Sequence, residues 1–236
     1  MPRDRGFIMK TIITTLIMLL SLATFGQNSC SKYYPFKEGS VSTYEMLNKK
    51  GKTDGTISYT VSNVDDSGSS TTATVTSELF DKKGKSVMSS EYEMDCNGTS
   101  VTINFKSLMN ADMMKQLQNG EVEITGTNIE IPNELEPGQT LPDSGINITI
   151  KMGGISMKMN TQVTGRKVVG TETVTTAAGT FDCVVITQDT EAKVMIANTR
   201  GSQKTWLAEG VGMVKTESYN ANGNLQNTTV LTAFSQ

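Results

Sequence analysis

The sequence predicts an all-β single domain, a mainly antiparallel curved sheet or barrel-like fold with one short helix at about residues 107–119. Three observations support this prediction. One turn motif recurs along the chain, segments of alternating apolar and polar residues flank it, and no linker or low-complexity run divides residues 27–236. A chain of this length is long enough to bury a core as one all-β domain.

The recurring turn motif begins with Asn or Asp and ends three residues later with Gly. It occurs as Asn48-Lys49-Lys50-Gly51, as Asp81-Lys82-Lys83-Gly84 and as Asn220-Ala221-Asn222-Gly223. Asn and Asp favour the first position of a type I turn, and Gly accepts the left-handed conformation that follows it. Each copy lies between strand-like segments, so we predict three hairpins with solvated lysines or asparagines at their tips.

Alternation is clearest on both sides of Gly153-Gly154, within "INITIKMGGISMKMNTQV". A two-residue loop there places Met152 opposite Ile155, Ile150 opposite Met157, and Ile148 opposite Met159. All six side chains then project from one face, which we expect to be buried, because a slip of one residue would bury the polar set instead. Further apolar rows that we expect on single faces are Ile57, Tyr59 and Val61, and Ala73, Val75 and Leu79.

The predicted helix is the segment "SLMNADMMKQLQNG". Met109, Met113 and Leu117 recur in it at four-residue spacing, and Asn119-Gly120 can end it.

The N-terminus has the features of a secretory signal peptide. Lys10 supplies a positive charge, residues 11–22 form an apolar core, and Thr24-Phe25-Gly26 offers small residues for cleavage. We therefore expect residues 1–26 to be removed, with residues 1–8 an upstream extension, and the mature protein to be periplasmic or secreted. Lipid anchoring through Cys30 is not expected, because Gln27-Asn28-Ser29 lacks the Leu-type residue of such a cleavage site.

The composition of the chain argues against several classes of function. Residues 1–26 hold three basic and one acidic residue, so their removal changes the net charge from −3 to −5. A mildly acidic chain does not indicate nucleic-acid binding, and no other segment is long and apolar enough to span a bilayer. The chain contains no histidine, which excludes Ser-His-Asp and Cys-His catalytic sites within it.

Other chemistry has weak support, and we expect no catalytic residue, cofactor or metal. Carboxylate pairs occur at Asp65-Asp66, in a predicted turn, and at Glu121 and Glu123, on the predicted solvent face of a strand. A hydrolase that uses such carboxylates or a Ser-Lys pair stays open as a second alternative. The methionines could suit copper, but they follow apolar faces, so we interpret them as packing residues.

The three cysteines leave at least one thiol without an intramolecular partner. We favour a disulfide between Cys30, near the mature N-terminus, and Cys96, beside the predicted Asn97-Gly98 turn; the two rival pairs stay open. Cys183 lies within the apolar run "FDCVVI" and is expected to be a buried thiol.

Three stretches carry a resemblance to a known family: "YYPFKEG", "TTAAGTFDC" and "WLAEGVGMVKTES". Together they resemble a domain-of-unknown-function family of secreted or periplasmic Gram-negative proteins. Relatives often have Pro where this chain has Ala177. The resemblance implies a curved antiparallel sheet similar to lipoprotein-carrier half-barrels, and it implies no activity and no catalytic residue.

These observations predict a non-catalytic exported envelope protein that binds an apolar or amphipathic ligand on the concave face of its sheet. The expected lining is Met113, Leu117, Met152, Met157 and Met159. The first alternative is a structural or interaction protein with a filled core, whose partner would be another envelope protein. A deep apolar cavity would favour the first reading over the second.

Overall fold

The computed structural model describes residues 30–104, 121–152 and 154–236. Thirteen strands make up its regular structure, and none of the described residues is helical. The strands are β1 (Val41–Asn48), β2 (Thr53–Asp66), β3 (Thr71–Asp81), β4 (Ser86–Cys96), β5 (Ser100–Ile103), β6 (Glu121–Thr127), β7 (Ile129–Pro132), β8 (Ser144–Met152), β9 (Ile155–Thr176), β10 (Gly179–Val194), β11 (Ala197–Ala208), β12 (Gly212–Asn220) and β13 (Leu225–Ser235).

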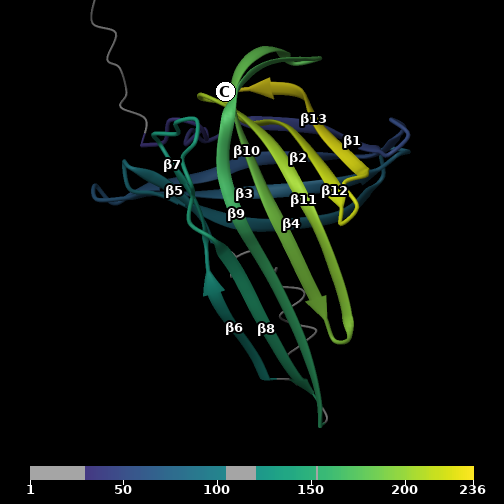
Figure 1. Cartoon of the computed structure of the whole chain (residues 1–236). Helices are drawn as coiled ribbons and strands as arrows, with labels where there is room; N and C mark the ends of the chain where they lie inside the picture. Colours follow the sequence, from purple (N-terminus) through teal and green to yellow (C-terminus); the bar gives the residue numbers. More distant parts are fainter. Residues whose placement is uncertain (1–29, 105–120, 153) are drawn as a thin grey trace, which may run out of the picture.

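All thirteen strands belong to one antiparallel sheet, in the order β6-β8-β9-β10-β11-β12-β13-β1-β2-β3-β4-β5-β7. The sheet is strongly bent: β1 to β5 run across the view of Figure 1, whereas β8 to β11 run down it. Register shifts occur in the long β9–β10 pair, between Val185 and Ile186 and between Thr187 and Asp189. Such bulges bend and twist a strand, so they allow the sheet to curve around its own apolar face. The predicted all-β curved sheet is confirmed.

The recurring turn motif closes three hairpins, β1–β2, β3–β4 and β12–β13, as predicted. In each, the Gly N–H donates to the carbonyl of the Asn or Asp three residues earlier, at 2.8, 2.9 and 2.9 Å. The glycines Gly51, Gly84 and Gly223 have φ of 70°, 78° and 77°. The side chain at the first position of the turn also stabilises it. Oδ1 of Asp81 accepts hydrogen bonds from the N–H groups of Lys83 and Lys85 at 2.8 and 3.0 Å.

The register predicted for the β8–β9 hairpin is correct. Ile148 pairs with Met159, Ile150 with Met157, and Met152 with Ile155. The burial of this face is lower than expected, because Ile148 and Ile150 are only half-buried and Met157 is 38% exposed. This hairpin forms the outer part of the sheet, next to the edge strand β6, so fewer strands surround it than surround the centre.

Two predicted segments lie outside the described residues: the signal peptide, residues 1–26, and the helix at about 107–119. No helix that could cross a membrane occurs in residues 30–104, 121–152 and 154–236.

Two core clusters lie on the two faces of β10. Ile186 packs on one face with Tyr33, Ile131, Leu135, Leu141, Val168 and Leu207. Cys183 and Val185 pack on the other face with Trp206, Ala208 and Val214. Successive strand residues point to opposite faces, so the continuous apolar run of residues 183–186 allows β10 to be buried on both sides.

A third cluster lies under the first half of the sheet. Its buried members are Val61, Ala73, Val75, Met94, Cys96 and Val101. Val61, Ala73 and Val75 belong to the apolar rows expected from the sequence, and the structure places them on one face as predicted.

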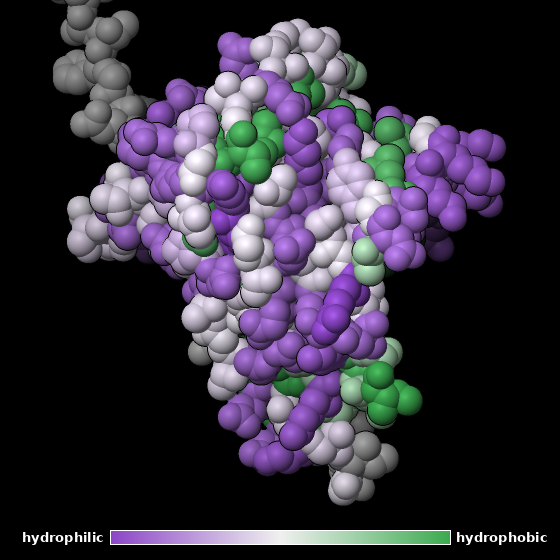
Figure 2. All heavy atoms as spheres, in the orientation of Figure 1, coloured by the Kyte–Doolittle hydropathy of each residue, from purple (hydrophilic) through white to green (hydrophobic). Residues whose placement is uncertain are grey.

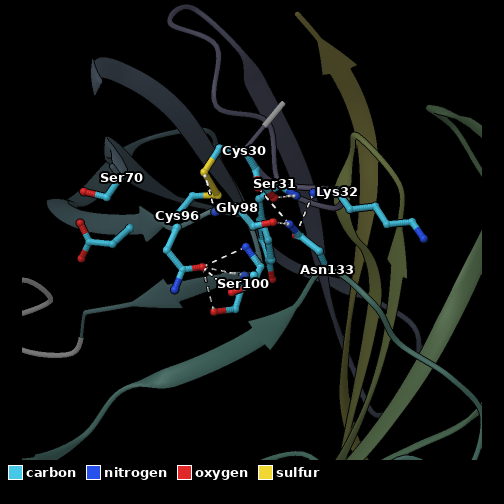
Figure 3. The surroundings of a disulfide bond; sticks show 12 residues. Cys30, Ser31, Lys32, Ser70, Cys96, Gly98, Ser100 and Asn133 are labelled. Carbon is cyan, nitrogen blue, oxygen red and sulfur yellow. Dashed lines mark hydrogen bonds between the residues drawn. A yellow bond between two sulfur atoms is a disulfide. The ribbon is translucent and has the colours of Figure 1, made fainter. Parts of the chain in front are cut away.

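The segment before β1 is tied to the sheet by a disulfide and an asparagine (Figure 3). Cys30 and Cys96 form the disulfide, which is the pair favoured by the sequence. Nδ2 of Asn133 donates to the carbonyls of Cys30 and Gly98, at 2.9 and 3.0 Å. Its Oδ1 accepts from the N–H of Lys32 at 3.0 Å. These bonds hold the N-terminal segment across one end of the sheet, where Tyr33 enters the core.

The face seen in Figure 2 is largely hydrophilic, with a few separate apolar areas. One of them lies at the lower end of the β10–β11 hairpin, where Val194, Met195 and Ile196 are 40%, 67% and 102% exposed. Met195 has φ of 55°, a conformation that residues other than Gly, Asn and Asp adopt rarely.

Candidate functional site

Four tyrosines gather on the concave side of the sheet. Tyr34 comes from the N-terminal segment, and Tyr44, Tyr59 and Tyr92 come from β1, β2 and β4. The rings of Tyr44 and Tyr59 meet edge to face with centroids 5.7 Å apart, and those of Tyr59 and Tyr92 do so at 6.2 Å. Aromatic pairs favour this geometry. Tyr44, Tyr59 and Tyr92 therefore form a row of edge-to-face rings, which together with Tyr34 we call the aromatic wall.

The tyrosine hydroxyls are neutral at physiological pH. Burial raises the pKa of Tyr34 to about 12, and it also raises the pKa values of Tyr44, Tyr59 and Tyr92. The hydroxyl of Tyr44 donates to the carbonyl of Met213 at 2.8 Å, which ties β1 to β12 across the sheet interior. Neutral phenols offer hydrogen-bond donors inside an otherwise apolar wall.

Two neighbouring cavities adjoin this aromatic wall and share Tyr34, Tyr59, Ile103 and Met213 in their lining. The smaller has a volume of about 180 Å³ and is also lined by Tyr44, Tyr92, Val61, Val75 and Met94. The larger has a volume of about 310 Å³ and extends between Ile57, Ile129, Ile131, Ile186 and Leu207. The space inside the sheet therefore suits an apolar guest of small-molecule size.

The larger cavity also has polar groups in its wall. Gln188 and Gln203 face each other from β10 and β11 and are hydrogen-bonded at 2.7 Å. Arg166, Thr205, Thr216 and Thr229 complete this polar part of the lining. The cavity is therefore amphipathic, with one polar wall and an otherwise apolar surface.

The sequence placed the binding site on other residues. Met113 and Leu117 lie outside the described residues, as does the side chain of Met152. Neither Met157 nor Met159 lines either cavity.

The sequence did not predict that these four tyrosines would lie together, nor that Met46, Met94 and Met213 would line the cavities beside them. Tyr44, Tyr59 and Tyr92 stand at apolar positions of alternating segments, which is a detectable signal for each strand alone. Their convergence depends on three strands and the N-terminal segment, so no local pattern contains it.

Cys183 and Trp206 occupy the opposite face of β10 and β11. The Cys183 thiol is free and buried, and burial raises its pKa to about 11. This fits the expected buried thiol. The indole N–H of Trp206 donates to Oε2 of Glu172 at 2.8 Å. The ammonium groups of Lys204 and Lys215 lie 4.5 and 4.6 Å from the centre of its rings.

The carboxylates considered from the sequence lie on the surface. Asp65, Asp66, Glu121 and Glu123 are exposed, and Glu121 pairs with Lys151 at 3.2 Å. In the described part of the chain, no three Cys, Asp or Glu side chains form a group that could hold a metal ion.

The fold places the chain among all-β proteins built on one bent antiparallel sheet. The sequence matches the DUF3108-like family over residues 37–231, and the chain belongs to that family. No curated protein matches it.

Two solved structures share the fold. One is a Bacteroides fragilis protein inferred to be exported, with a YmcC-like fold, and the other is a Parabacteroides distasonis protein inferred to be a lipoprotein. For each, the TM-score is 0.69 at 22% identity, with 88% of this chain and 100% of the other chain covered. The expected family resemblance is thereby confirmed.

Proposed function

We propose that this chain is an exported, non-catalytic binding protein that holds an apolar or amphipathic small molecule inside its bent sheet. The observation that carries the proposal is the pair of adjoining cavities behind Tyr34 and Tyr59, with volumes of about 180 and 310 Å³. A protein with a purely structural role gains stability by filling such space, because each unfilled volume costs packing energy. An unfilled apolar interior is what a binding protein needs.

Export is supported by three independent observations. Residues 9–26 have the pattern of a signal peptide, the Cys30–Cys96 disulfide suits an oxidising compartment, and the two structural neighbours are inferred to be exported or lipoproteins. Because the sulfur of Cys30 is used in the disulfide, it is not free to carry a lipid thioether. We therefore propose a periplasmic or secreted protein without a lipid on Cys30.

The direct test is titration of the delipidated mature protein, residues 27–236, with dodecanoate and with longer acyl chains by calorimetry. We expect saturable binding of one ligand per chain with a micromolar Kd, on the order of −8 kcal/mol. Absence of saturable binding for every chain length would contradict the proposal and leave the structural role.

A matched pair of variants locates the site. Ile57→Trp enlarges a side chain that lines the larger cavity and should weaken binding by about tenfold or more, since a hydrophobic pocket has no room for both groups. Ser58→Trp places the same ring on the opposite face of β2 and should leave the affinity unchanged. Equal weakening by both substitutions would show that the ligand binds elsewhere.

A further inference from the structure

Arg166 is the largest fully buried side chain of the described protein, with 1% of its surface exposed. Its guanidinium donates to two main-chain carbonyls, from Nη1 to Pro142 at 2.7 Å and from Nη2 to Glu130 at 3.1 Å. Nε is buried and has no hydrogen-bond partner. The guanidinium forms no salt bridge with a carboxylate of the described residues.

This arrangement leaves a charge only partly compensated. Arginine stays protonated in proteins, and an ionised group that loses water without a counter-charge is costly. The carboxylates of Asp143 and Glu130 act on Arg166 from a distance, and burial lowers its pKa. Carbonyl dipoles hold the guanidinium in place, but they do not neutralise it.

Arg166 lies in the wall of the larger cavity. Among the described residues that line the two cavities, it is the one that carries a charge. Tyr34 lines both cavities. One cationic group therefore lines a cavity whose other polar residues are neutral and whose remaining surface is apolar.

We infer that the cavity selects anionic amphiphiles, with the carboxylate of a long-chain carboxylic acid beside Arg166 and its alkyl chain along the tyrosines and Met213. This inference rests on the proposed binding function and adds the chemistry of the head group. An anion in the cavity supplies the missing counter-charge, and the attraction is strong because a buried charge is poorly screened by water.

The competing explanation is that Arg166 only braces the fold, since its two carbonyl bonds link β9 to β7 and to the segment before β8. A brace makes no distinction between a charged and an uncharged ligand of equal length. A charged and an uncharged ligand of equal length, both titrated into the unaltered mature protein, therefore distinguish the two explanations.

The experiment measures the affinities of dodecanoate and of 1-dodecanol for the delipidated mature protein by calorimetry at neutral pH. We expect the acid to bind at least about tenfold more tightly than the alcohol. Arg166→Met should lose this preference and bind both equally, whereas Arg166→Lys should retain part of it. Arg200→Met removes an exposed arginine paired with Glu191 and should leave the preference intact.

Equal binding of acid and alcohol to the unaltered protein overturns this inference and leaves the proposed function standing. Absence of binding for both ligands, and for the longer acyl chains as well, overturns the proposed function itself. A preference that survives Arg166→Met in a folded variant also overturns the role of Arg166. If Arg166→Met does not fold, the ligand comparison in the unaltered protein and in Arg166→Lys decides the question.

Discussion

The side-chain amide of Asn133 donates a hydrogen bond to the main-chain carbonyl of Cys30 at 2.9 Å, across 103 positions of the sequence. The same amide accepts from Lys32 and donates to Gly98, so one residue joins the N-terminal segment to the turn between β4 and β5. The disulfide lies beside it. A covalent link and a satisfied asparagine together fix the segment that delivers Tyr33 and Tyr34 to the interior.

The first prediction concerns Asn133. Asn133→Ala removes two donated bonds and one accepted bond and should lower the free energy of unfolding by about 1–3 kcal/mol, because partly buried main-chain groups lose their partners. Urea unfolding followed by circular dichroism measures this loss. Asn227→Ala, on an exposed position of β13, is the control and should change stability by less than about 0.5 kcal/mol. A similar small change for Asn133→Ala would contradict its bridging role.

The second prediction concerns the cysteines. Non-reducing peptide mapping should find Cys30 linked to Cys96. The double variant Cys30→Ser/Cys96→Ser should lose about 2–4 kcal/mol in the free energy of unfolding. Cys183 should react with a thiol reagent only after unfolding, because it is 1% exposed and burial raises its pKa to about 11. A linked Cys183, or rapid labelling of the native protein, would count against this arrangement.

The third prediction uses the repeated turn. Asp81→Ala removes the acceptor for Lys83 and Lys85 and should cost about 1 kcal/mol in urea unfolding, the typical contribution of such a bond. Asp81→Asn is the matched control, because Asn48 and Asn220 make the same pair of bonds in their turns. It should be near neutral. An equal loss for Ala and Asn would mean that the charge, not the acceptor, matters.

The fourth prediction concerns pH. The hydrogen bond from Lys204, followed by that from Trp206, lowers the pKa of Glu172 below its ordinary value. A lowered folded-state pKa means that the ion pair is complete above the ordinary Glu pKa and is lost as the pH falls through the lowered value. Trp206 is the single tryptophan of the chain, so its fluorescence reports this site. We expect an acid transition in emission that is absent from Glu172→Gln.

A transition of equal size in Glu172→Gln would assign the fluorescence change to another group. Lys204→Met provides the complementary variant, since loss of the ammonium should move the midpoint toward the ordinary Glu range.

The fifth prediction concerns the β8–β9 hairpin. Ile148 is half-buried, so Ile148→Ala should cost roughly 1 kcal/mol, less than the 2–5 kcal/mol typical of fully buried aliphatic residues. Leu231→Ala, at a position with 0% exposure, is the comparison and should fall in that higher range. Thermal or urea unfolding of the two variants measures the difference. A larger loss at Ile148 than at Leu231 would contradict the burial that the structure assigns.

Local chemistry made much of the fold predictable. The turns at Asn48, Asp81 and Asn220 follow from residues within five positions of each other, and the register of Ile150 with Met157 follows from a two-residue loop and a period of two. The apolar rows at Val61 and Val75 also follow from alternation. Each of these features depends on neighbours in sequence, so the sequence by itself determined them.

The interior was decided by tertiary structure. Tyr34, Tyr59, Arg166 and Met213 come from distant segments, and only the bend of the sheet brings them to one cavity. Nothing in the residues around Arg166 distinguishes a buried cation from a solvated one on an outward face of β9. Its burial depends on carbonyls from Glu130 and Pro142, which reach it only in the folded sheet. Alternation determines which side chains share a face, whereas curvature determines which faces meet and how much space remains between them.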